Sequence, residues 1–163
     1  MSGRLADTTG PDVPELISDD SVILLPVGAI EQHGPHLPMS VDTVIAEETS
    51  NALLDSVGDE IDLWLLPTLS ISKSNEHTWS PGTLSYGSTT MISVLDDIAK
   101  CVSTTAARRL VILNGHGGNT SLLITACRDI RVAHGLLTFL VHPSVPPASG
   151  GTSTEEELSL IHI

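Results

Sequence analysis

Aromatic residues and positive charges are the scarcest features of this sequence. Only 2% of its 163 residues are aromatic, and 7 Lys and Arg stand against 20 Asp and Glu, which gives a net charge of −13. This acidity argues against a nucleic-acid backbone or an anionic membrane surface as a partner, because both carry charge of the same sign. With so few aromatic side chains, the core must be built mainly from Leu, Ile, Val and Ala.

Long apolar runs and cysteines are also scarce. No apolar run reaches the ~18–20 residues of a membrane span, and the first twelve residues lack the apolar segment of a secretory signal. Both cysteines, Cys101 and Cys127, fall in apolar helical patterns, so we expect buried free thiols in a reducing compartment. The sequence therefore predicts a cytoplasmic protein, and its length fits one domain.

Strand and helix patterns alternate along the chain. We expect strands over 21–29, 61–67, 110–113 and 136–141. Between them we expect helices over 42–57, 89–106 and 120–134. This alternation predicts an α/β fold, with helices on both faces of a mostly parallel central sheet. Residues 1–142 then form one domain with a turn-rich start, and 143–163 are expected to be a linker or tail that begins a truncated or foreign segment.

The helix expected over 42–57 carries three further predictions. Asp42 or Thr43 is expected to cap its start. An apolar stripe is expected to face the core, formed by Val44, Ile45, Leu53, Leu54 and Val57. Gly58 is expected to end the helix.

Two polar loops follow expected strands. They are 30-IEQHGPHLPMSVD-42 and 114-NGHGGN-119. Ligand crevices of parallel sheets lie beyond the carboxyl ends of the strands, so the two loops can share one crevice. Glu31 and His33 are one residue apart and point the same way if the chain is extended. Asp42 follows a prolyl loop that can fold back, and glycines around His116 free the backbone of its turn.

Two carboxylates and two imidazoles on neighbouring strand ends predict a divalent metal site. Because carboxylate oxygens are left over, a two-ion site bridged by Asp42 is one arrangement of Glu31, His33, Asp42 and His116. Each residue also has an ordinary interpretation: a solvated Glu, a capping Asp, or a hydrogen-bonding His. The glycine turn could instead bind phosphate, although it lacks the Lys of a P-loop and the GxGxxG spacing.

The long loop 68–88 is a second functional candidate, because loops of that length are often functional. It contains Glu76, His77 and Trp79, which are candidates for a substrate pocket. His77 and His36 stay open between metal ligand, support of a ligand and pocket wall, and both are candidate proton donors.

Three segments together resemble the creatininase (creatinine amidohydrolase) family: 26-PVGAIEQHGPHLPMSVDTVIAE-47, 74-SNEHTWSPGTLS-85 and 112-ILNGHGGN-119. Their order and spacing match over residues 21–141. The resemblance implies a three-layer α/β/α fold that assembles into an oligomer. It also implies a centre of two divalent ions, for which zinc is the first expectation and manganese or iron are alternatives. It implies hydrolysis of non-peptide amide bonds in small molecules.

The same resemblance assigns roles to four residues. Glu31 would hold one ion and His33 the other, Asp42 would bridge the two, and His116 would join the first ion. Creatininase proper has a second-ion glutamate where this chain has Gly118. This difference favours relatives with the all-glycine turn, which include formamide hydrolases of flavin-type cofactor biosynthesis and the peptidase-like member of the mycofactocin pathway.

The family also continues with a His-Ala-Gly…Glu-Thr-Ser block that supplies catalytic groups, and residues 143–163 show no match to it. We therefore expect a truncated chain that binds metal with low or absent activity. The alternative from another class is a non-enzymatic binding or assembly subunit that keeps the site for folding and oligomer contacts.

Overall fold

Five parallel strands form the centre of the fold in the computed structural model, which describes residues 1–144. The sheet order is β1-β3-β2-β4-β5. The strands are β1 (Gly3–Arg4), β2 (Val22–Val27), β3 (Leu63–Leu65), β4 (Arg109–Asn114) and β5 (Leu137–Val141). The helices are α1 (Val13–Leu16), α2 (Val41–Ile61), α3 (Ser88–Val102) and α4 (Thr120–His134), and short 3-10 turns lie at Leu5–Asp7, Gly10–Asp12, Asn75–His77 and Gly117–Asn119.

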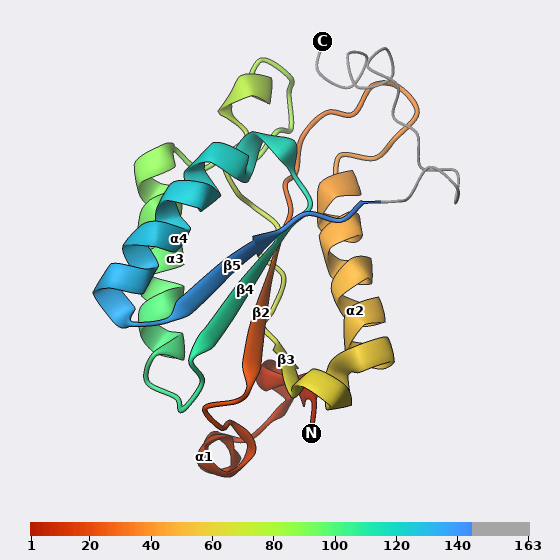
Figure 1. The fold of residues 1–163 in the computed structure, drawn as a ribbon. Helices are drawn as coiled ribbons and strands as arrows, with labels where there is room; N and C mark the ends of the chain where they lie inside the picture. Colours follow the sequence, from red (N-terminus) through yellow and green to blue (C-terminus); the bar gives the residue numbers. More distant parts are fainter. Residues whose placement is uncertain (145–163) are drawn as a thin grey trace.

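The sheet lies between two helical layers. Helices α3 and α4 cover one face and α2 the other (Figure 1). Side chains such as Leu25 and Ile112 pack toward α3 and α4, whereas Leu24, Leu65 and Leu113 pack toward α2. Because both faces are covered, the central strands are apolar at nearly every position. The predicted α/β architecture is confirmed, and it has three layers.

Several strands and helices begin or end at residues other than those predicted. Strand β3 is shorter than 61–67, and α3 ends at Val102, before the expected 106. Strand β1 was missed, because two residues in a polar segment leave no periodic pattern; its Gly3 pairs with Trp64. Cys127 is buried as expected, but Cys101 is exposed on α3. The tail predicted for 143–163 lies almost entirely outside the described residues.

Helix α2 ends differently from the prediction. It continues through Gly58, which is buried inside the helix, and ends at Ile61. Asp62 then adopts a left-handed conformation with φ 49°, and its carboxylate accepts hydrogen bonds from Ser21 and Trp64. A short polar side chain tolerates this conformation better than most residues, so the helix stops at Asp62 rather than at the glycine.

The buried side of α2 also differs from the prediction. Its first half turns Thr43, Ala46 and Ser50 inward, while Val44 and Ile45 are 48% and 40% exposed. No side chain caps the helix start. The predicted cap and the first part of the stripe, Val44 and Ile45, are therefore wrong, because small and polar residues face inward there. Leu53 and Leu54 in the second half of α2 pack against the core as predicted.

Two glycines explain why small residues face inward. A Cβ at Gly28 would lie 2.4 Å from Thr43 Cα, and a Cβ at Gly115 would lie 2.3 Å from the backbone oxygen of Asp42. Neither glycine has a positive φ. The missing side chains therefore serve close packing, and the first turn of α2 rests directly on the ends of β2 and β4. Across residues 1–144, no helix has both the length and the apolar character needed to cross a membrane.

We expect Gly115→Ala to lower the free energy of unfolding by about 1–3 kcal/mol, because the new methyl group must push the α2 backbone away. Chemical denaturation measures this change. Gly117→Ala is the matched control, since a Cβ at Gly117 has no neighbour within 4 Å. Equal stability of the two variants would contradict the close-packing argument.

Candidate metal centre

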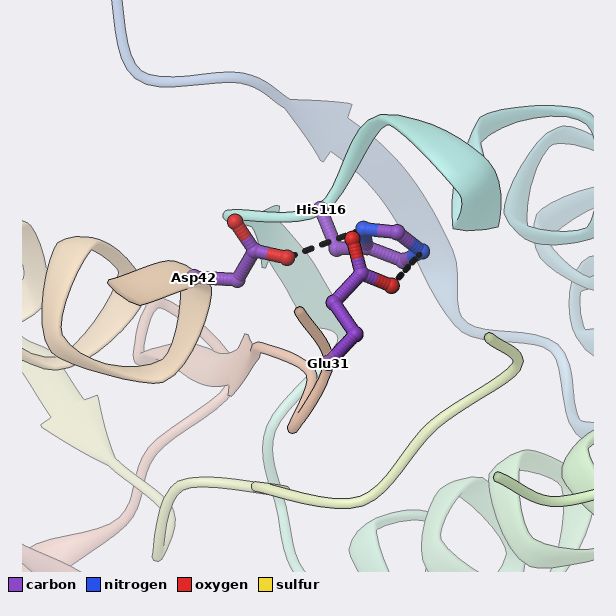
Figure 2. A group of neighbouring side chains, drawn as sticks. All are labelled: Glu31, Asp42 and His116. Atoms are coloured by element: carbon purple, nitrogen blue, oxygen red, sulfur yellow. Dashed lines mark ion pairs between the residues drawn. The ribbon is translucent and has the colours of Figure 1, made fainter. Parts of the chain in front are cut away.

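Three buried side chains meet where β2, β4 and α2 come together. Glu31 follows β2, Asp42 lies in the first turn of α2, and His116 lies in the turn after β4 (Figure 2). One ligand atom from each lies within 4.8 Å of the other two. The prolyl loop folds back as expected, with the Glu31 amide donating to the Met39 carbonyl over 3.0 Å. The two loops thus bring their side chains together.

The contacts inside this group leave polar atoms unsatisfied. His116 Nδ1 lies 2.9 Å from Asp42 Oδ2, and His116 Nε2 lies 3.3 Å from Glu31 Oε2. Yet Asp42 Oδ2 and His116 Nε2 are buried without a hydrogen-bond partner. Buried polar atoms are nearly always paired, and an unpaired one costs about 1–3 kcal/mol. A divalent cation bound by these atoms would satisfy both, so the donor set fits such an ion.

His33 is oriented toward the same carboxylate. Its Nδ1 lies 3.1 Å from the backbone oxygen of Glu31, and its Nε2 lies 3.1 Å from Asp42 Oδ1. Metal-binding histidines usually donate their other ring N–H to a backbone carbonyl or a carboxylate, which leaves the free nitrogen for the metal. Asp42 therefore directs one oxygen toward each imidazole.

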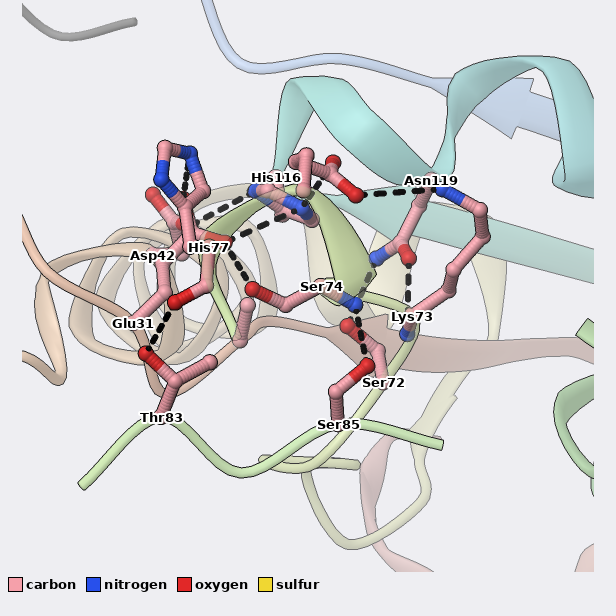
Figure 3. Close-up of polar contacts among 12 residues, drawn as sticks. Glu31, Asp42, Ser72, Lys73, Ser74, His77, Thr83, Ser85, His116 and Asn119 are labelled. Carbon is pink, nitrogen blue, oxygen red and sulfur yellow. Dashed lines mark hydrogen bonds and ion pairs between the residues drawn. The ribbon is translucent and has the colours of Figure 1, made fainter. Parts of the chain in front are cut away.

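His77 and Ser74 support Glu31 from the other side. His77 is buried with Nε2 3.5 Å from Glu31 Oε1, and the Ser74 hydroxyl donates to Glu31 Oε2 (Figure 3). The second ring nitrogen of His77 lies 3.4 Å from the Gln32 amide. Both ring nitrogens of His77 thus face protein groups.

A buried polar network, missed in the sequence, fixes the long loop to the strands. Asn119 Nδ2 donates to Ser72 Oγ over 3.0 Å and to Asn114 Oδ1 over 3.2 Å, and the Lys73 amide donates to Asn119 Oδ1 over 3.2 Å (Figure 3). Ser72 Oγ in turn donates to the Gly28 carbonyl over 2.6 Å. The alternating serines of 70-SISKS-74 are the sequence pattern that could have predicted this network. In an extended chain, period-two spacing puts Ser72 and Ser74 on the same face.

The remaining candidates lie at the edge of the site. Glu76 Oε1 is 3.5 Å from His116 Nε2, and its Oε2 is 3.2 Å from Lys73 Nζ. Trp79 is 65% exposed, with its ring centroid 6.5 Å from that of His77. His36 is exposed and has no polar contact with the cluster among the described residues.

The electrostatics of the cluster favour a cation. Burial lowers the pKa of His116, but the close contact of its Nδ1 with Asp42 Oδ2 and the charges of Glu31, Asp42 and Glu76 outweigh it and raise that pKa. Burial raises the pKa of Glu76, but its backbone hydrogen bond and Lys73 outweigh it and lower that pKa. A carboxylate thus lies beside the glycine turn, which argues against the phosphate alternative.

The sequence matches one protein family over nearly its whole length. The family model of creatininase, described as creatinine amidohydrolase, matches residues 6–162, a wider range than 21–141. The chain belongs to the creatininase family. Over 144 residues it is 35% identical to the mycofactocin precursor peptide peptidase of Mycolicibacterium smegmatis, which covers 87% of this chain and 58% of that protein. Over 131 residues it is 35% identical to the creatinine amidohydrolase of Pseudomonas putida, which covers 75% of this chain and 48% of that protein.

Solved creatininase structures share the fold. The manganese form of creatininase superposes with a TM-score of 0.69 at 29% identity, covering 87% of this chain and 58% of that one. A creatininase variant described as Zn–Zn type superposes with a TM-score of 0.68 at 29% identity. The match covers 85% of this chain and 57% of that one. The chain spans 48% to 58% of the length of these relatives.

The raised pKa of His116 predicts opposite pH trends for stability and metal binding. Without metal, protonated His116 stabilises the fold below its ordinary pKa of 6.5, and this contribution is lost as pH rises through the raised value. Metal must displace that proton, so the apparent Zn²⁺ affinity should rise by about tenfold per pH unit below the pKa of His116. Calorimetric Zn²⁺ titrations from pH 5 to 8 measure the affinity, and chemical denaturation of the metal-free protein over the same range measures the stability. An affinity that does not change over this range would contradict the assignment.

Proposed function

We propose that this chain is a metal-dependent amidohydrolase domain acting on a non-peptide amide or formamide bond of a small molecule. The observation that carries this proposal is the pair of unpartnered buried atoms, Asp42 Oδ2 and His116 Nε2, beside the carboxylate of Glu31. The metals in the names of its structural relatives, zinc and manganese, support a divalent ion. We take zinc as the first expectation and manganese or iron as alternatives, with two ions per site.

The chemistry divides between the ions and the side chains. Bound divalent ions supply water activation near neutral pH and positive charge against a developing oxyanion. Glu31, Asp42 and His116 would hold the first ion, while His33 would hold the second with Asp42 shared. Ser74 and His77 fix the Glu31 carboxylate, which keeps the donor set in place. Of the two candidate proton donors, only His77 contacts this set, while His36 faces solvent.

Two alternatives follow from specific observations. The 35% identity to a mycofactocin precursor peptide peptidase supports a peptidase-like relative that acts on a peptide-derived substrate. A non-enzymatic binding or assembly subunit that keeps the site for folding and oligomer contacts is the other alternative, because Gly118 leaves the glycine turn without a carboxylate. We also propose that the protein is cytoplasmic and that it forms a homo-oligomer. Light scattering on the purified protein measures its mass and so tests the homo-oligomer.

Removing two metal ligands tests the site directly. We expect Glu31→Ala combined with His33→Ala to lose most of the bound zinc, because each ion then loses a ligand. Elemental analysis of the purified protein measures the metal content. Glu48→Ala is the control, since Glu48 lies exposed on the same loop-to-helix unit. Unchanged metal content in the double variant would refute the ligand assignment.

The substrate class is tested by assay of the metal-loaded protein. We expect turnover of small amides or formamides, loss of turnover in a chelator, and recovery when Zn²⁺ or Mn²⁺ is returned. Creatinine and a peptide with a free C-terminus are assayed alongside. Cleavage of the peptide alone supports the peptidase alternative, and metal binding without any turnover supports the non-enzymatic one.

A further inference from the structure

The carboxylate of Glu76 lies where a side chain at position 118 would lie. An ideal Cβ built on Gly118 falls 1.9 Å from Glu76 Oε1 and 2.4 Å from His116 Nε2. Real Cβ atoms essentially never come so close to another heavy atom. Glu76 and a side chain at position 118 therefore exclude each other in this arrangement.

The backbone does not explain the glycine at position 118. Its φ is not positive, unlike those of Gly34, Gly82 and Gly135, so an L-residue could adopt the conformation. The neighbouring Gly117 provides a comparison within the same turn, because a Cβ there meets nothing within 4 Å. Gly118 is thus set apart by the two functional groups that fill its side-chain space.

Glu76 is held with one oxygen directed at the cluster. Lys73 Nζ binds Oε2 at 3.2 Å, and Oε1 is left 3.5 Å from His116 Nε2. That nitrogen is itself buried and has no hydrogen-bond partner. Glu76 lies in the short turn Asn75–His77. His77 of this turn and Ser74, which directly precedes it, both contact Glu31. The turn that supports one carboxylate ligand thus delivers a second carboxylate to the same site.

We propose that Glu76 is a carboxylate ligand of the metal centre, admitted through the space that Gly118 leaves. This inference rests on the proposed metal-dependent function. The 114-NGHGGN-119 turn contributes His116 but no carboxylate of its own. The second ion of the proposed centre would then have only His33 and the shared Asp42, one fewer than the three protein ligands of a catalytic zinc ion. Glu76 supplies the third ligand from a different loop, and Lys73 positions it.

The affinity for Zn²⁺, measured by competition with a chromogenic chelator, tests this role. We expect Glu76→Gln to weaken binding of at least one ion by about tenfold or more, as even outer-shell changes weaken metal sites by 10- to 100-fold. Glu48→Gln is the matched control on an exposed carboxylate. Lys73→Met should weaken binding less than Glu76→Gln, because it removes the positioning group and keeps the ligand.

A transplant of the carboxylate tests whether positions 76 and 118 serve the same place. We expect Glu76→Ala combined with Gly118→Glu to bind Zn²⁺ more tightly than Glu76→Ala alone, since alanine at position 76 clears the space that the Glu76 carboxylate fills beside Gly118. A folded double variant that regains nothing would contradict the shared position. Thermal unfolding of each variant verifies that it is folded.

The outcomes separate this inference from the proposed function. If the wild-type protein binds no Zn²⁺, the proposed metal centre is wrong. If the wild type binds Zn²⁺, Asp42→Asn abolishes binding and Glu76→Gln matches the wild type, then the metal centre stands and the role of Glu76 is overturned.

Discussion

The close approach of helix α2 to the ends of β2 and β4 is the constraint on which the site depends. Gly28 and Gly115 have no side chains, so the backbone around Asp42 and Thr43 packs directly on the strands. This contact puts the Asp42 carboxylate between His33 and His116. A longer helix-to-sheet distance would leave the same residues in the sequence but would separate their side chains in space.

Charge gives this geometry its chemical meaning. Glu31 and Asp42 are buried together, Glu76 lies beside them, and Lys73 is the cationic side chain paired there. Carboxylates removed from water are stabilised only by hydrogen bonds, paired charges or bound ions. Ser74 and the histidines supply part of this stabilisation. A divalent cation would supply the rest, and the unpartnered atoms of Asp42 and His116 mark where it would bind.

Much of the arrangement was predictable from local pattern. Alternating strands and helices predicted the parallel sheet, and the position of two polar loops after strands predicted that Glu31, His33, Asp42 and His116 would meet. Contacts between distant segments were not predictable in the same way. The inward face of α2, where Thr43 replaces the expected Val44 and Ile45, follows from glycines far away in sequence.

Loop conformation set the other limit of prediction. Glu76 is 42 residues from Gly118, and nothing in either segment alone shows that the first fills the side-chain space of the second. The polar network of Ser72, Asn114 and Asn119 also joins segments that no periodic pattern connects. These contacts depend on how a long loop packs over two strand ends, which is decided by tertiary structure.

Anomalous diffraction from crystals grown with Zn²⁺ tests the central claim most directly. The account predicts an anomalous peak bound by Glu31, Asp42 and His116, at about 2.0–2.2 Å from the ligand oxygens and nitrogen. A Zn²⁺ peak elsewhere, with Asp42 and His116 left in direct contact and no ion between the three side chains, would contradict it.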